Sequence, residues 1–331
     1  MAPISFVMRI LLLNQNHIGD ALFTTPAIAA LRAALPDATI VNAAVSGIEP
    51  VFAANPHLSE RWDRPTARVS DYPLYALRIR RARFYAVVSF SASSTLFGVY
   101  ARFSGAPVKI GFNHPATQRF MTHSVDLHDV EQHHAVDHLD QVALLADIRR
   151  DFPMEMPLMP AWREEADRAL AGLALPGGRP IIALNPGATV DRKKWAPERW
   201  ADLAGRLTLS GCQPVLFGGP GDADLTALIQ SATSCPLPSL QGQLSLGCLA
   251  AAITRCAAFV SGDTGPMHVA VAVGTPVVAL HGPTDPARTG PYTENAVVIH
   301  HPEAGPDPDI YGRMETVTVD EVFAGVHSVI S

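Results

Sequence analysis

Residues 257–282, AAFVSGDTGPMHVAVAVGTPVVALHG, indicate the fold class. Two short apolar runs rich in β-forming residues, AAFVSG (257–262) and TPVVALHG (275–282), enclose the helical run PMHVAVAVG (266–274). A strand, a helix and a second strand in this order are typical of a parallel sheet with a crossover helix. This stretch therefore predicts an α/β fold.

The same alternation continues over nearly the whole chain. In the second half we predict further strands at 180–185, 214–219 and 296–300, and helices at 196–210, 222–232, 244–256 and 319–330. In the first half we predict strands at 6–14, 39–45, 85–90 and 108–112, and helices at 19–35, 73–84 and 93–103. Each half is thereby predicted to be a doubly wound unit with its own parallel sheet.

The segment DFPMEMPLMP (151–160) separates the two halves. It is rich in Pro and Met and lacks helical periodicity, so it predicts a linker. We expect a first domain at 1–155 and a second at 156–331, facing each other across a cleft. In open parallel sheets, ligands bind beyond the carboxyl ends of the strands, so the loops that follow the strands are where binding residues are expected.

The composition is that of a folded globular protein. A chain of 331 residues with 48% hydrophobic and 17% charged residues can bury a large core, and its length favours two domains. The start lacks the cleavage site of a secretion signal, and no apolar run approaches the roughly 20 residues that span a bilayer. We therefore expect a cytoplasmic protein, which can still work at a membrane surface.

Neither the cysteines nor the histidines form a metal-ligand pattern. The four cysteines contain no C-x-x-C pair, and the six histidines between His114 and His138 lack fixed ligand spacing. We expect ordinary thiols and ordinary loop and surface histidines. The four cysteines are Cys212, Cys235, Cys248 and Cys256.

The net charge of −6 conceals a basic segment. Between Glu60 and Phe120 there are ten Arg or Lys residues and three acids, and LRIRRARF (77–84) alone holds Arg78, Arg80, Arg81 and Arg83. One interpretation is a solvated helix face, and the other is a landing surface for an anionic partner. A nucleic acid is not expected as that partner, because the whole chain is acidic and no nucleic-acid-binding motif accompanies the segment.

The loop between the first strand and the helix of the opening stretch has the character of a phosphate site. The first turn of a helix offers free backbone N–H groups and the positive end of the helix dipole, and Gly265 allows a ligand to approach the backbone closely. Asp263, Thr264 and His268 lie around this turn. The alternatives are that Asp263 and Thr264 only cap the helix and that His268 is a core residue.

A second loop of the same half strengthens the prediction of a phosphate ligand. PGATVDRKKW (186–195) follows a predicted strand and contains Gly187, Thr189 and Lys193. A lysine here can neutralise a diphosphate while Thr189 and nearby N–H groups donate to its oxygens. Two loops of this kind in one domain predict a nucleotide that contains a diphosphate.

In the first half, NQNHIGDALFTTPAI (14–28) places Asp20 at the start of a predicted helix. Helix capping is one role for Asp20. The other is that of a general base, because a carboxylate across the cleft from a diphosphate ligand can remove a proton from an attacking hydroxyl. This loop lacks G-x-G-x-x-G, which argues against a nicotinamide-dependent dehydrogenase.

Three long motifs, in the right order, resemble glycosyltransferase family 9, the ADP-heptose:lipopolysaccharide heptosyltransferases. They are IGDALFTTPAIAALRAALPDA (18–38), NPGATVDRKKWAPERWADLA (185–204) and SGDTGPMHVAVAVGTPVVALHGPTDPARTGP (261–291), with a weaker match in MTHSVDLHDVEQHHAVDHLDQVALL (121–145). The resemblance implies the GT-B architecture, in which two Rossmann-like domains bind the acceptor and the nucleotide sugar respectively. In such folds the last helix can pack back onto the first domain.

The resemblance also implies roles for individual residues. Asp20 matches the catalytic base, Thr189 and Lys193 match positions at the donor phosphates, and Asp263 matches a contact to the donor sugar. Thr264, Gly265 and His268 fall in the loop that holds the diphosphate. Asp222, after the strand predicted at 214–219, is placed to reach the nucleotide ribose. Arg78, Arg80, Arg81 and Arg83 become candidates for binding the anionic acceptor, the Kdo or phosphorylated heptose of the lipopolysaccharide inner core.

The reaction implied is a single inverting displacement, in which Asp20 deprotonates an acceptor hydroxyl that attacks the anomeric carbon of ADP-heptose. Lys193 and a helix N-terminus are expected to meet the charge on the departing ADP, so neither a metal nor a cofactor is expected. The two D-x-D strings, 222–224 and 307–309, are interpreted as a helix start and a Pro-rich loop. The acceptor is expected to be a glycolipid at the inner membrane surface, and we predict no transmembrane segment.

One departure from the family pattern and three alternatives remain. Members often have a basic residue six positions before the catalytic Asp, where this chain has Asn14. The alternatives are a family 9 transferase with another donor or acceptor, a nucleotide-sugar epimerase of similar architecture, and a nucleotide-sugar-binding protein without catalysis.

Overall fold

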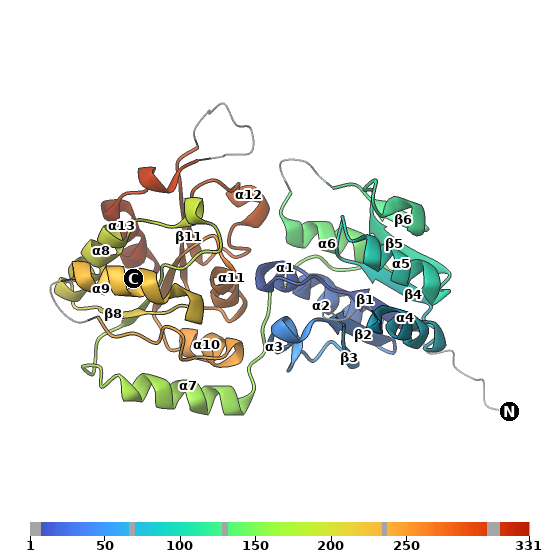
Figure 1. Ribbon diagram of the computed structural model, residues 1–331, viewed down its shortest axis with the longest axis horizontal. Helices are drawn as coiled ribbons and strands as arrows, with labels where there is room; N and C mark the ends of the chain where they lie inside the picture. Colours follow the sequence, from blue (N-terminus) through green and yellow to red (C-terminus); the bar gives the residue numbers. More distant parts are fainter. Residues whose placement is uncertain (1–7, 66–69, 128–131, 234–236, 303–311, 331) are drawn as a thin grey trace. The chain divides into compact units, whose positions relative to one another are not determined.

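The computed structural model describes residues 8–65, 70–127, 132–233, 237–302 and 312–330 (Figure 1). The chain divides into two compact units between Met154 and Glu155. The segment 147–159 has no regular secondary structure, and the next helix starts at Pro160. The first two positions of the strand predicted at 6–14 lie outside the described residues. So do Cys235 and the D-x-D string at 307–309.

The first unit is built on a six-stranded parallel sheet in the order β3-β2-β1-β4-β5-β6. In chain order the strands are β1 (Arg9–Leu13), β2 (Thr39–Ala44), β3 (Glu60–Asp63), β4 (Ala86–Ser89), β5 (Val108–Phe112) and β6 (His123–Val125). The side chains of the central strand from Ile10 to Leu13 are fully buried, as a parallel strand covered on both faces requires. This strand order is that of a Rossmann-type sheet.

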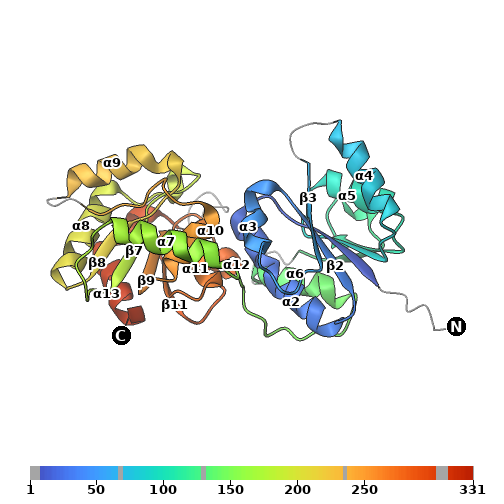
Figure 2. The ribbon, with the colours of Figure 1, turned by 90° about the horizontal axis from the view of Figure 1, so that it is seen from below.

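Helices cover both faces of this sheet. The pair α4 and α5 and the pair α2 and α6 each pack together, on opposite sides of the strands (Figure 2). The helices are α1 (Ile18–Phe23), α2 (Thr25–Ala34), α3 (Glu49–Phe52), α4 (Asp71–Arg81), α5 (Thr95–Ser104) and α6 (His134–Ala143), with 3₁₀ turns at η1 (Ser46–Ile48) and η2 (Gln118–Phe120).

The helix predicted at 19–35 is two helices, and the prediction of one was wrong. Pro26 has no N–H to donate to the carbonyl of Leu22, and the Thr25 hydroxyl donates to that oxygen instead, at 2.8 Å. The Thr24 hydroxyl likewise donates to the Ala21 carbonyl, at 2.7 Å. The Thr25 hydroxyl takes the place of the N–H that Pro26 lacks, and α1 ends at Phe23.

The second unit contains a five-stranded parallel sheet in the order β11-β10-β9-β7-β8. The strands are β7 (Ile181–Asn185), β8 (Gln213–Leu216), β9 (Ala258–Gly262), β10 (Val277–His281) and β11 (Ala296–His300). The helices are α7 (Pro160–Gly172), α8 (Pro197–Leu209), α9 (Ala223–Ala232), α10 (Leu246–Ile253), α11 (Gly265–Ala272), α12 (Pro286–Thr289) and α13 (Val319–Ile330), with 3₁₀ turns at η3 (Asp191–Lys193), η4 (Pro220–Asp222) and η5 (Met314–Thr316).

The core of the second unit includes two edge-to-face tryptophans, Trp195 and Trp200, with ring centroids 5.1 Å apart. The Trp195 indole N–H donates to the carbonyl of Val317, just before α13, at 2.9 Å. Helix α13 packs on α8 and on β9, β10 and β11 within this unit. Its predicted contact with the first unit stays a prediction.

The predicted α/β class is confirmed, and every predicted strand overlaps an observed one. The sequence did not predict the edge strands β3 and β6 or the helices α6 and α7. Cys212, Cys248 and Cys256 are buried free thiols. Within the described ranges, no helix has the length and apolar character needed to cross a membrane.

Candidate functional site

In each sheet the strand order reverses at one point, and the predicted site residues gather there. In the first sheet the chain leaves β1 in one direction for β2 and later returns to place β4 on the other side of β1. In the second sheet the same reversal occurs between β7 and β9. Loops that follow two such strands diverge and leave a crevice at their carboxyl ends, which is where doubly wound sheets bind ligands.

In the second unit the residues after β7 and β9 are tied together by hydrogen bonds. The Asn185 amide donates to the Ser261 hydroxyl at 3.1 Å. Ser261 is in turn 3.1 Å from the Thr264 hydroxyl. A side chain at Gly262 would approach the Lys193 carbonyl to 3.2 Å, so the loop after β7 lies directly against the end of β9. The switch point is therefore pre-formed.

The centre of this site is a buried ion pair between Lys193 and Asp263. Lys193 Nζ donates to Asp263 Oδ2 at 2.7 Å, and the two side chains are 22% and 7% exposed. Thr289 Oγ1 lies 3.4 Å from the same oxygen, and His268 Nε2 lies 3.7 Å from Oδ1. The Lys193 ammonium is thus held at the amino end of α11.

Electrostatics keep Asp263 ionised. Burial by itself raises the pKa of this carboxyl, but the contact with His268, the charge that His281 carries once it is protonated at low pH, and the charge and hydrogen bond of Lys193 outweigh it and hold the pKa well below its usual range. Burial lowers the pKa of His281, at the end of β10, to about 4, so this imidazole is neutral at physiological pH.

Asp263 and Thr264 are not helix caps in the structure, so this alternative was wrong. Thr264 occupies the N-cap position of α11, but its side chain makes no capping hydrogen bond. Asp263 is paired with Lys193 instead. His268 is buried, at 4% exposure, and its contact with Asp263 makes it part of the site rather than of the apolar core. In the first turn of α11, Pro266 has no N–H and the Met267 N–H donates to the Thr264 carbonyl at 3.1 Å, so Gly265 is the candidate to donate its N–H to a ligand.

Gly187 and Asp222 form a second contact of this unit. The Asp222 carboxylate accepts a hydrogen bond from the Gly219 N–H at 2.8 Å and lies over Gly187, where an added Cβ would be 2.5 Å from it. A residue other than glycine at 187 would displace this carboxylate. Thr189 is exposed on the same loop. Its predicted contact with a phosphate, and that of Asp222 with a ribose, remain predictions.

In the first unit, Asp20 lies in the first turn of α1 and does not cap it. The N-cap position is His17, and no side-chain cap bond is made there. Asp20 is partly exposed, and among the described residues its carboxylate has neither a hydrogen bond nor an ion pair. An ionisable carboxylate without a partner, in the helix that follows the central strand β1, is compatible with a general base.

Asn14, at which the sequence departs from the family pattern that we expected, is a structural residue in this chain. Its side chain is fully buried. Its amide N–H₂ donates to Thr24 Oγ1 at 2.9 Å and to Asn42 Oδ1 at 3.1 Å, and its Oδ1 accepts from the Gln15 N–H at 2.8 Å. Asn14 therefore fixes the β1–α1 loop against β2 and the start of α2.

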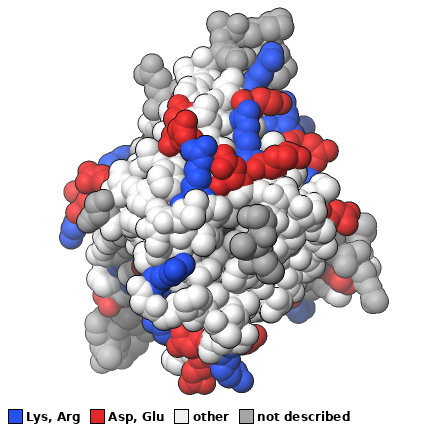
Figure 3. Space-filling view, turned by 90° about the vertical axis from the view of Figure 1, so that its left-hand side faces the viewer, with Lys and Arg blue, Asp and Glu red and all other residues white. Residues whose placement is uncertain are grey.

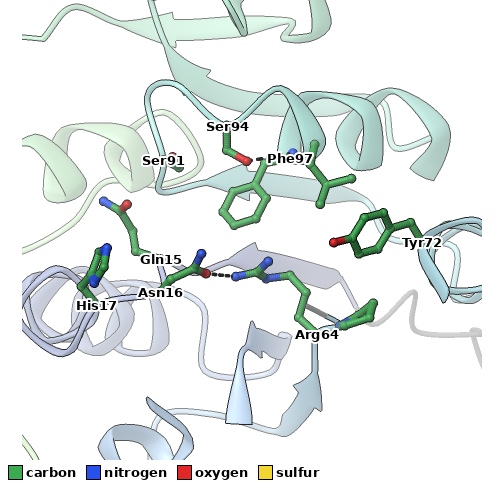
Figure 4. Close-up of a pocket in the computed structure, with 10 residues that line it drawn as sticks. Gln15, Asn16, His17, Arg64, Tyr72, Ser91, Ser94 and Phe97 are labelled. Atoms are coloured by element: carbon green, nitrogen blue, oxygen red, sulfur yellow. Dashed lines mark hydrogen bonds between the residues drawn. The ribbon is translucent and has the colours of Figure 1, made fainter. Parts of the chain in front are cut away.

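Beside this loop is a cavity of about 340 Å³ at the switch point of the first sheet. It is lined by residues from three loops: Gln15, Asn16 and His17 after β1, Arg64 after β3, and Ser91 and Ser94 after β4. Figure 4 shows the Arg64 guanidinium directed toward Asn16, beneath the ring of Phe97. Asp20 lies three residues beyond His17, in the helix that this loop begins.

Arg64 is the residue that the sequence did not predict. It is 4% exposed, and its guanidinium contacts the Asn16 side chain, the Asn14 carbonyl at 3.5 Å and the Phe97 ring at 4.6 Å. Its Nε has no hydrogen-bond partner, and no carboxylate among the described residues pairs with it. Burial lowers its pKa. A buried cation without an anion is costly, so the cavity favours an anionic ligand.

The four predicted acceptor-binding arginines do not line this cavity. Arg78 stacks on the Trp62 ring at 3.9 Å, and Arg80 lies against Gly105, where an added Cβ would be 2.3 Å from its Nη1. Arg81 and Arg83 are exposed at the end of α4. Their contact with an acceptor stays a prediction. No group of three or more His, Cys, Asp or Glu residues suited to a metal ion occurs in the part of the chain described.

Comparison with known proteins agrees with this arrangement. Residues 91–316 match the family model described as glycosyltransferase family 9 (heptosyltransferase). Lipopolysaccharide heptosyltransferase 2 of Salmonella typhimurium is 26% identical over 348 residues, covering 98% of this chain and 99% of that protein. Lipooligosaccharide heptosyltransferase 2 of Haemophilus influenzae is 37% identical over 131 residues, 38% of each chain.

Solved structures share the fold over the whole length. The family 9 glycosyltransferase of Veillonella parvula has a TM-score of 0.87 at 24% identity, covering 98% of this chain and 97% of that one. The ADP-heptose lps heptosyltransferase II of E. coli has a TM-score of 0.82 at 22% identity, covering 98% of each chain. The two Rossmann-like units thus have the GT-B architecture, and the match to the family model defines the chain as a glycosyltransferase. The chain belongs to glycosyltransferase family 9, the heptosyltransferase family.

Proposed function

We propose that this glycosyltransferase moves heptose from ADP-heptose to a hydroxyl of the lipopolysaccharide inner core, on Kdo or on heptose. The observation that most supports this is the Lys193–Asp263 pair at the amino end of α11, 2.7 Å across and largely buried. A cation and a helix N-terminus at the switch point of a doubly wound sheet are suited to a nucleotide diphosphate. The relatives named for lipopolysaccharide heptose transfer support the choice of sugar and acceptor.

The proposed donor site lies in the second unit. A diphosphate at the first turn of α11 would accept hydrogen bonds from the Gly265 N–H and from the Thr264 hydroxyl. Lys193 would lie beside it, because Asp263 already holds the ammonium at this position. Gly187 leaves room for the Asp222 carboxylate against the loop after β7, and Asp222 is the candidate for the ribose hydroxyls.

The proposed acceptor site lies in the first unit. The cavity after β1, β3 and β4 provides one buried cation, Arg64, and polar side chains from Gln15, His17 and Ser94. A carboxylate or phosphate of the acceptor would pair with Arg64 and complete its hydrogen bonding. Asp20, on the helix that follows the β1 loop, would then be near the acceptor hydroxyl.

The proposed chemistry is a single displacement with inversion. The acceptor oxygen forms a bond to the anomeric carbon while the bond from that carbon to the ADP oxygen breaks, and the electron pair leaves with ADP. Asp20 takes the hydroxyl proton. Lys193 and the first turn of α11 stabilise the negative charge that develops on the β-phosphate, which is the role that a divalent cation has in other transferases. We propose that neither a metal nor a cofactor takes part, and that the protein works at the cytoplasmic face of the inner membrane.

Calorimetric titration of the protein with ADP, UDP, GDP and CDP, without added metal, tests the donor assignment. Selective binding of ADP is the expected result. Preference for UDP or another nucleotide would keep the family and overturn ADP-heptose as the donor, and it would favour a family 9 transferase with another sugar.

A further inference from the structure

Helix α4 presents a mixed apolar and basic stripe on its outer side. Tyr75 and Ile79 form its buried face. Leu74, Leu77, Arg78 and Arg81 are spaced i, i+3, i+4 and i+7, so they share one face of the helix, turned away from the buried one. Leu74 is 70% exposed and Leu77 is 42% exposed. Two large apolar side chains are thus directed to solvent beside two arginines.

The neighbouring helix extends this surface. Helix α5 packs against α4, beside it in both views (Figures 1 and 2). Phe103, near the end of α5, is 60% exposed, and Arg102 precedes it. From Asp71 to Gly105 the chain has five arginines and one acid, in a protein whose net charge is −6. We call this surface, comprising Leu74, Leu77, Arg78, Arg81, Arg102 and Phe103, the α4–α5 surface.

Neither proposed binding site uses the α4–α5 surface. The cavity at Arg64 is lined by other residues, and the diphosphate site belongs to the second unit. The guanidinium of Arg78 lies 3.9 Å over the Trp62 ring, which fixes a cation at the edge of the apolar stripe. An uncompensated basic surface that also exposes Leu and Phe has no evident structural purpose.

We propose that the α4–α5 surface docks the protein on an anionic lipid bilayer. A helix that lies in the plane of a membrane interface inserts its apolar side chains among the acyl chains, while flanking arginines pair with lipid phosphates. The α4–α5 surface has both elements, in the arrangement that this mode of binding needs. A nucleic acid would use the arginines but leave Leu74, Leu77 and Phe103 in water, which makes it the weaker match. The docking does not depend on which sugar is transferred.

Vesicle co-sedimentation of the full chain tests this proposal. The protein is mixed with vesicles of phosphatidylcholine alone, or of phosphatidylcholine with phosphatidylglycerol, and the bound fraction is measured for wild type and for the Leu74→Asp/Leu77→Asp variant. The matched control is Leu209→Asp/Leu228→Asp, because Leu209 and Leu228 are 90% and 56% exposed on α8 and α9 of the second unit. Acidic and basic residues are intermixed on that side of the molecule (Figure 3), as in the pair Arg206–Asp202.

We expect the wild type and the control to bind the vesicles that contain phosphatidylglycerol, and the α4 variant to bind them about tenfold more weakly or worse. Arg81→Glu should also weaken binding and reduce its dependence on salt. Equal binding to both kinds of vesicle, no binding to either, or equal losses in the two double variants would overturn the proposal. Sedimentation velocity distinguishes the alternative that this surface mediates self-association. If the wild type is a dimer and the α4 substitutions dissociate it, the partner of the α4–α5 surface is a second copy of the chain and not a membrane.

Discussion

Replacement of Lys193 by Met should destabilise the protein and weaken its binding of ADP, because it leaves the buried Asp263 carboxylate without its closest cation. The pair is 2.7 Å across, with side-chain exposures of 22% and 7%. Loss of one partner of a fully buried pair costs about 3–5 kcal/mol. Because Lys193 keeps some contact with water and His268 remains 3.7 Å from the other carboxylate oxygen, we expect the lower value of about 2 kcal/mol in the free energy of unfolding.

A double-mutant cycle with Asp263→Asn isolates the pair itself. Asp263→Asn alone should cost less than Lys193→Met, since the freed ammonium can turn toward solvent. The coupling between the two changes should be about 1–2 kcal/mol by urea unfolding at pH 7.5. This pH lies above the range in which Asp263 titrates: its lowered pKa stabilises the fold above about pH 4, and that contribution is lost as the pH falls through the folded-state value.

Lys194→Met is the matched control, because Lys194 pairs at 2.8 Å with an exposed residue, Asp191. It should leave both the stability and the ADP affinity nearly unchanged. Lys193→Met should weaken ADP binding about tenfold or more by calorimetry, which is the effect of one charge-assisted contact to phosphate. Additive effects within about 0.5 kcal/mol in the cycle, or unchanged ADP affinity in Lys193→Met, would refute the account of this pair.

Three further predictions concern other parts of the molecule. Arg64→Gln should raise the KM for an anionic, detergent-solubilised acceptor about tenfold or more while the ADP affinity stays unchanged. An equal rise in this KM in Arg81→Gln would indicate instead that the acceptor binds at the arginines predicted from the sequence. Gly187→Ala should weaken ADP binding, because its Cβ would lie 2.5 Å from Asp222, whereas Gly205→Ala in α8, with open space around it, should not; equal affinities in the two variants would contradict the close packing. Burial lowers the pKa of both His138 and His281 to about 4, so the unfolded chain binds more protons than the folded one between pH 4 and about 6.5. The free energy of unfolding should therefore fall as the pH falls through this window, and His281→Gln should reduce this pH dependence by up to one proton. If urea unfolding gives the same pH dependence for His281→Gln as for the wild type, the burial of His281 as a neutral group is contradicted.

The central strands and their helices were predictable because their signals are local. Residues 10–13 and 277–280 are continuous apolar runs bounded by polar loops, which is how strands buried on both faces are recognised. The edge strand β3, of sequence ERWD, has three charged residues among four and no apolar run, since an edge strand is only partly covered. Because β3 was not predicted, Arg64 directly after it did not stand out from the basic segment as a residue at a strand end.

The sequence predicted which loops form the site, but not which side chains pair within it. The sequence placed Asp263 and Lys193 after two strands, but their 2.7 Å contact depends on β7 and β9 being neighbours, and that order is set by the packing of the whole unit. The role of Asn14 similarly depends on Asn42 and Thr24, which are 28 and 10 positions away. Contacts between residues so far apart in the chain are properties of the tertiary fold and carry no sequence signal of their own.

The most direct test of the account is transfer itself, measured by mass spectrometry with ADP-heptose and, in parallel, a lipopolysaccharide acceptor that ends in Kdo and one that ends in an inner-core heptose; transfer to either one is the expected result. The wild type should add one heptose per acceptor and release ADP without added metal. Asp20→Asn should lower the turnover by about 100-fold to 10,000-fold, the range that a general base contributes, while calorimetry finds the ADP affinity unchanged. No heptose added to either acceptor by a wild-type protein that binds ADP would contradict heptose transfer, and an Asp20→Asn variant that keeps most of its turnover would remove Asp20 as the base.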